Sequence, residues 1–96
     1  MTPSQLLAQN RQQILSIIAT HHASRPRVFG SVLRGEDTEK SDLDLLVDPL
    51  PGATLFDMGG IQMDLEELLG IPVDVVTPGD LPQKFRQQVL QEARPL

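Results

Sequence analysis

The sequence predicts an α/β fold of the α+β kind, with a small mixed three-stranded sheet flanked by helices in the order α-β-β-α-β-α. Segments whose apolar residues recur every three or four positions alternate with short strand-like segments. A helical segment separates the second and third strand segments, as a crossover between neighbouring strands requires. A chain of 96 residues is too short for a second core, so residues 1–96 are expected to form a single domain.

Composition excludes several classes of protein. Apolar residues make up 40% of the chain and charged residues 22%, which is typical of a globular protein. No apolar run is long enough for a membrane span or an export signal, and there is no cysteine, so we expect a cytoplasmic protein without membrane contact. The net charge of -5 disfavours direct nucleic-acid binding. It suits a basic protein partner or multivalent cations, although solvated surface acids explain it equally well.

The first half of the chain should contain one long helix and two short elements. Thr2–Gln5 reads as a capping box with proline at the first helical position, and an apolar stripe follows to about Thr20. Arg27–Phe29 is then predicted to be a short strand that ends at Gly30-Ser31. One helical turn, Val32–Arg34, and a polar loop come next.

The second half should contain two strands and two helices. Residues alternate in polarity from Ser41 to Val47, which predicts a strand, and a long helix is expected from about Thr54 to Leu69 with Gly70 as its cap. Gly59-Gly60 inside this helix indicates either a bend or the close approach of another backbone. The last two elements are a strand, Val73–Thr77, and a helix capped by Asp80 with these apolar residues facing inward: Leu81, Phe85, Val89 and Leu90. The three aromatic residues are all expected in the core: Phe29, Phe56 and Phe85.

Three aspartates form the candidate catalytic group. Asp42 and Asp44 share one strand face with Cα atoms about 6.6 Å apart, and carboxylates so close require a compensating charge. Asp74 lies in the strand that the crossover helix leads to, where it can stand beside them. Three carboxylates can hold two Mg²⁺ ions, which together stabilise an in-line displacement at phosphorus.

A glycine–serine corner accompanies the acids. Gly30 and Ser31 follow a strand, where backbone N–H groups and the hydroxyl can contact phosphate oxygens, and ten residues separate them from Asp42. The segment lacks the ending of a P-loop, and the aspartates lack the remaining ligands of an EF-hand. Adjacent His21 and His22 point in different directions on a helix, which argues against a metal-binding role for them.

These residues resemble a known family. Val28–Glu36, Ser41–Val47 and Val73–Thr77 are similar to the motifs of the minimal nucleotidyltransferases of the DNA polymerase β superfamily. In particular, the chain resembles MntA-type antitoxins of type VII-like pairs, in which a HEPN-domain ribonuclease toxin is the partner. The likeness is strong from about residue 28 to 78 and extends to the flanking helices in length and order.

The resemblance implies a function and a set of roles. It implies a protein adenylyltransferase that transfers AMP from ATP to a tyrosine of the HEPN toxin, within a hetero-oligomer. Asp42 and Asp44 would ligate both Mg²⁺ ions and Asp74 one of them, while Gly30 and Ser31 would hold the triphosphate. Arg34 is a candidate extra phosphate contact. Two alternatives remain open: an antitoxin that neutralises by binding alone, and a nucleotidyltransferase that acts on a small molecule or an RNA end.

Overall fold

The computed structural model describes residues 1–96 and confirms the mixed α/β class. A four-stranded sheet has the order β3-β2-β1-β4, in which β2 and β3 are parallel and the other pairs are antiparallel. The chain runs through α1 (Pro3–Gln9), α2 (Arg11–Thr20), β1 (Ala23–Phe29), α3 (Gly30–Arg34), β2 (Leu43–Pro49), α4 (Leu55–Leu69), β3 (Val73–Val76), the 3₁₀ turn η1 (Pro78–Asp80), α5 (Gln83–Glu92) and β4 (Arg94–Pro95).

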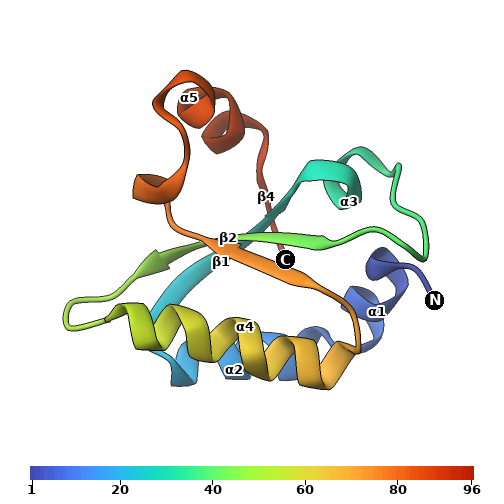
Figure 1. The fold of residues 1–96 in the computed structure, drawn as a ribbon, viewed down its shortest axis with the longest axis horizontal. Helices are drawn as coiled ribbons and strands as arrows, with labels where there is room; N and C mark the ends of the chain where they lie inside the picture. The colour runs from blue at the N-terminus through green and yellow to red at the C-terminus, as the bar shows by residue number, and fades with distance from the viewer.

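The helices divide between the two faces of the sheet (Figure 1). Helices α2 and α4 lie side by side under one face, and α3 and α5 stand above the other. Alternation along β2 turns Leu43, Leu45 and Val47 toward α2 and α4, where they are fully buried. The same alternation leaves Asp44 and Asp48 on the opposite face, which α3 and α5 cover only in part.

The main core lies between the sheet and the α2–α4 layer. Its buried side chains come from α2, α4 and the three longer strands: Ile14, Ile18, Ala23, Val28, Leu43, Leu45, Val47, Ile61, Leu65, Leu69 and Val73. The crossover from β2 to β3 through α4 is therefore packed, as the alternation of segments predicts. None of the helices is both long enough and apolar enough to cross a membrane.

Three expectations about the elements are wrong. Asp80 does not cap the last helix, because the residue before α5 is Pro82 and the Asp80 carboxylate accepts from Thr77 instead. The sheet has a fourth strand, because Arg94–Pro95 pairs with Arg27 and Val28 at the edge of β1. The first helix is two helices, because Asn10 ends α1 and begins α2, with its side-chain amide donating to Leu6 O at 2.9 Å. An asparagine that hydrogen-bonds the preceding turn in this way competes with helix continuation.

The apolar positions of α4 and α5 are also less buried than expected. Phe56 is 90% exposed and Phe85 is 50% exposed, so only Phe29 of the three aromatic side chains is largely covered. Helix α5 contains no buried residue, although Leu81 just before it is buried. Helical spacing identifies the apolar face of a helix, whereas depth depends on what packs against that face.

The two glycines of α4 have different environments. A side-chain carbon at Gly60 would lie 2.6 Å from the ring of His21, so glycine is required there for the imidazole to pack against the helix. His21 Nε2 in turn lies 2.7 Å from Asp64 Oδ2, which ties the end of α2 to α4. At Gly59 nothing lies within 4 Å of the same position. Close approach of a neighbour therefore explains Gly60 and leaves Gly59 unexplained.

Alanine at these two positions should have opposite effects on stability. Gly59→Ala removes a poor helix former without a clash and should raise the free energy of unfolding by about 0.5–1 kcal/mol. Gly60→Ala displaces the His21 ring and should lower it, despite the same gain in helix propensity. Urea unfolding of the two variants beside the wild type measures the difference. Equal stabilisation by both would show that the His21 contact is unimportant.

Candidate functional site

The two strand aspartates lie side by side on the open face of the sheet. In the parallel pairing of β2 with β3, Asp44 is the register partner of Asp74. Asp44 is partly buried and Asp74 is exposed. Asp42 precedes β2 by one residue and is close enough to raise the energy of the charged Asp44. The structure thus places Asp44 and Asp74 side by side, with Asp42 near enough for its charge to act on the Asp44 carboxylate.

The glycine–serine corner lies directly against Asp44. Phe29, the last residue of β1, is the antiparallel partner of Asp44, so the chain turns into α3 beside that carboxylate. Gly30 has a φ of 73°, and a side-chain carbon there would collide with Asp44 Oδ2. Gly35, with a φ of 70°, ends α3, and Glu36 N donates to Ser31 O at 2.9 Å. Glycine at position 30 is therefore required both by the turn and by the carboxylate.

The carboxylate group is electrostatically strained. Burial, and then the negative charges of Asp74 and Asp42, raise the pKa of Asp44 from 3.8 to about 6. The Arg34 guanidinium acts in the opposite direction on the same pKa, so Arg34 is close enough to sense this charge. Its Nε also lies 3.1 Å from Glu36 Oε2. A carboxylate whose charged form is raised in energy by neighbouring acids is one that a bound cation would stabilise.

The acids fit a divalent cation in donor type and charge. Carboxylate oxygens are the ligands that Mg²⁺ prefers, and neither Asp44 nor Asp74 forms a salt bridge with a basic side chain. The side chains of the structure do not form a ready group of three metal ligands. The roles of Asp42, Asp44 and Asp74 as metal ligands, and of Gly30, Ser31 and Arg34 in nucleotide binding, therefore stay predictions.

The loop before Asp42 is held by hydrogen bonds at both ends. Asp37 accepts from Ser4 N at 2.8 Å and from Ser4 Oγ at 2.7 Å, which ties the loop to the first turn of α1 and lowers the pKa of Asp37. At the other end, Thr38 N donates to Ser41 Oγ at 2.8 Å and Ser41 N to Thr38 O at 3.0 Å. The residue next to Asp42 is thereby placed by the fold.

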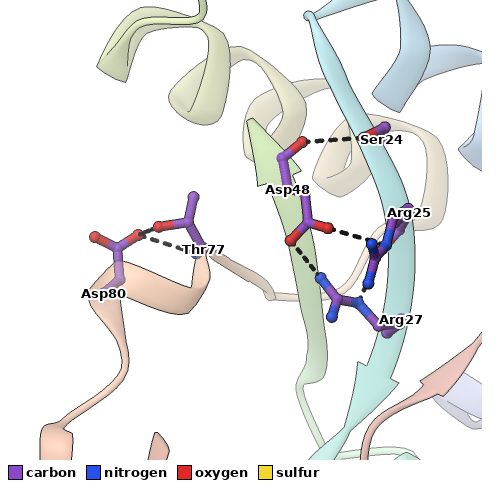
Figure 2. A network of polar contacts seen from close by, with 6 residues as sticks. All are labelled: Ser24, Arg25, Arg27, Asp48, Thr77 and Asp80. Atoms are coloured by element: carbon purple, nitrogen blue, oxygen red, sulfur yellow. Dashed lines mark hydrogen bonds and ion pairs between the residues drawn. The ribbon is translucent and has the colours of Figure 1, made fainter. Parts of the chain in front are cut away.

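A fourth aspartate on the same face was missed by sequence reasoning. Asp48 follows the alternation of β2, but the predicted strand ended one residue earlier. Figure 2 shows its carboxylate between two arginines of β1, with Arg27 Nη2 at 2.6 Å and Arg25 Nε at 3.1 Å. The same view shows the separate Thr77–Asp80 cap, in which the Thr77 amide and hydroxyl both donate at 3.0 Å to the Asp80 carboxylate. Unlike Asp44, Asp48 is fully paired.

The glycine–serine turn at Gly30 lies directly beside the register pair Asp44 and Asp74 on one face of the sheet. The chain belongs to the nucleotidyltransferase domain family, whose model matches residues 12–96, and it is a nucleotidyltransferase. It is 36% identical over 83 residues to a Methanocaldococcus jannaschii protein named "Putative protein adenylyltransferase", a match covering 86% of this chain and 89% of that one. It is 42% identical over 65 residues to the protein adenylyltransferase MntA of Thermococcus cleftensis, a match that covers 68% of this chain and 66% of that protein.

Two solved structures share the fold. One, described as "Structure of putative minimal nucleotidyltransferase", is 49% identical, has a TM-score of 0.86, and covers 97% of this chain and 95% of its own. The other, described as a toxin-antitoxin crystal structure with AMP-PNP, is 20% identical with a TM-score of 0.74. The match covers 90% of this chain and 71% of that one. The second likeness shows the fold alone.

The strained Asp44 should make the cation-free protein less stable as pH rises. Below about pH 4 both folded and unfolded states hold the proton, and above about pH 6 the folded state carries the full penalty of ionisation. Because Asp44 is partly exposed, we expect a loss of only about 1 kcal/mol across this window. Asp44→Asn should abolish that loss. Urea unfolding in EDTA at pH 4 and pH 7 measures it, and an equal pH response in both proteins would contradict the prediction.

Gly30 and Gly35 provide a matched pair for the corner. Both have left-handed φ values, so alanine at either costs about 1 kcal/mol of backbone strain. Only at Gly30 does the added carbon meet Asp44, since nothing lies within 4 Å of the Gly35 position. Gly30→Ala should therefore weaken AMP-PNP binding, measured by calorimetry with Mg²⁺, by at least tenfold. Gly35→Ala should leave the binding near the wild-type value.

Proposed function

We propose that this chain is a Mg²⁺-dependent protein adenylyltransferase that serves as the antitoxin of a type VII-like pair. It transfers AMP from ATP to a tyrosine of a HEPN-domain ribonuclease toxin. The observation that supports this most is the position of Asp44, in register with Asp74 and against Gly30. The relatives named as protein adenylyltransferases support the transfer to protein, and the AMP-PNP toxin-antitoxin complex of similar fold supports the pairing.

Each predicted residue has a role in this proposal. Asp42 and Asp44 would hold two Mg²⁺ ions, and Asp74 would share one of them. Gly30 and Ser31 would hold the triphosphate, with Gly30 allowing the backbone to pass against Asp44, and Arg34 would add a positive charge at the far end of α3. When bound, Mg²⁺ supplies charge neutralisation on the phosphates and a lower pKa for the acceptor hydroxyl.

The chemistry is a single in-line displacement. The tyrosine oxygen forms a bond to the α-phosphorus of ATP while the bond from that phosphorus to the bridging oxygen of the β-phosphate breaks. Pyrophosphate leaves with the electron pair of the broken bond, and the phenol proton passes to a carboxylate of the group. The exposed Asp74 is the carboxylate open to the acceptor.

The openness of the site favours an acceptor that is itself a protein. Strand β3 is at the edge of the sheet, and its Asp74 is exposed. The chain has few elements above this face, so a docked protein surface must exclude water from the reacting groups (Figure 1). A folded toxin presenting a tyrosine provides both the nucleophile and that cover.

Asp42→Asn and Asp44→Asn should abolish transfer. Each removes a carboxylate from the proposed cation site, so AMP incorporation into the co-expressed HEPN partner should fall by at least about a hundredfold. Intact-mass spectrometry of the partner with ATP and Mg²⁺ measures the incorporation, and EDTA should eliminate it in the wild type. Glu92→Gln, which removes an exposed carboxylate on α5, serves as the control.

The same variants separate catalysis from occlusion. If the aspartate variants still neutralise the toxin in growing cells without modifying it, the chain acts by binding alone and the proposed transfer is wrong. If incorporation appears on a residue other than tyrosine, the acceptor assignment fails while the transfer stands. Absence of incorporation by the wild type with ATP and Mg²⁺ would contradict the proposed function.

A further inference from the structure

The outer face of α4 carries large apolar side chains that nothing in the chain covers. Phe56 is 90% exposed and Met63 is 71% exposed. They are seven residues apart, so they lie two turns apart on one stripe, opposite the buried Ile61 and Leu65. Leu55, beside Phe56, is 87% exposed. Exposed apolar side chains gathered on one helix face indicate a contact surface.

Two adjacent glycines, Gly59 and Gly60, lie in the helix between Phe56 and Met63. Gly60 is explained by the His21 ring, but the space around Gly59 is open. Gly59 is helical, so no left-handed turn requires it, and alanine would favour the helix more. A bare stretch of backbone between two large side chains is a notch, and such a notch lets another helix approach closely.

Charge indicates what fits this face. Helix α4 contains four acids, Asp57, Asp64, Glu66 and Glu67, and no lysine or arginine. Beside the stripe, a groove of about 480 Å³ between α2 and α4 is lined by Ile17 and Leu68 together with Asp64 and Glu67. Asp57 and Asp64 face His22 and His21 at the end of α2, and Glu66 accepts from Val73 N. Glu67 is therefore the acid of this helix without a partner in the chain, and a second copy of α4 would offer it no lysine or arginine. A partner that supplies lysine or arginine along with apolar side chains matches both features.

We propose that the outer face of α4 is a docking site for a cationic amphipathic helix of a partner protein. The partner's backbone lies against Gly59 between Phe56 and Met63, and a basic side chain of the partner reaches Glu67. Because α4 is on the opposite face of the sheet from Asp44 and Asp74 (Figure 1), this contact leaves the catalytic face free. Only the identification of the partner with the toxin rests on the proposed function.

The test uses the full chain, labelled with ¹⁵N, and two helical peptides of equal length. One peptide is built from leucine and lysine and the other from leucine and glutamate. The lysine peptide should shift the amide resonances of α4 around Phe56, Gly59 and Met63 and bind at least tenfold more tightly than the glutamate peptide. Gly59→Leu, which fills the notch, and Met63→Gln should each weaken lysine-peptide binding at least tenfold. Gln88→Leu, at an exposed position on α5, should not.

Three outcomes would overturn the proposal: shifts that map to the β2–β3 face instead of α4, equal binding of both peptides, or concentration-dependent dimerisation that Gly59→Leu abolishes. Sedimentation velocity of the wild type and this variant detects the last. Titrations run without ATP or Mg²⁺, so a failure of AMP transfer leaves this result intact. Transfer by the wild type with no α4 binding would reject the docking site alone.

Discussion

The candidate site depends on one unfavourable contact, the crowding of Asp44 against Asp74 and the backbone of Gly30. Register between β2 and β3 sets the first of these neighbours, and the antiparallel end of β1 sets the second. The core beneath, formed by Leu43, Leu45 and Val73, holds the strands in this register because a slip of one residue would expose their apolar side chains. The energy of hydrophobic burial thus maintains a charge arrangement that is unstable by itself.

Asp48, on the same face of β2, shows how the fold neutralises a carboxylate with nearby arginines. Its two arginines occupy both oxygens, with Arg27 largely buried beside β4. Asp44 and Asp48 are therefore only four residues apart on the same face of β2, yet Asp48 is neutralised by two arginines and Asp44 has no such partner. This contrast supports a functional interpretation of Asp44, since the fold evidently has basic side chains with which to pair an acid on this face.

Much of this arrangement was predictable from the sequence because it depends on short-range patterns. Alternation from Ser41 to Val47 identified β2, and the crossover helix implied that Asp74 would lie next to it. Strand β4 was not predictable, since two residues, one of them proline, carry no periodicity and pair only through β1. The break at Asn10 was hidden because one apolar stripe continues across α1 and α2. The exposure of Phe56 and Phe85 was missed because spacing does not report whether another element covers a helix face.

The position of β3 at the edge of the sheet bears on which step would limit the rate of the proposed transfer. Enzymes that enclose their substrates spend part of each turnover opening and closing loops. Here Asp74 is exposed on a terminal strand. In the proposed transfer, the surface of the acceptor protein would complete the enclosure. Admission of the acceptor then becomes an encounter between two preformed surfaces, so the frequency of productive collisions, rather than an internal gate, governs how quickly the molecule works.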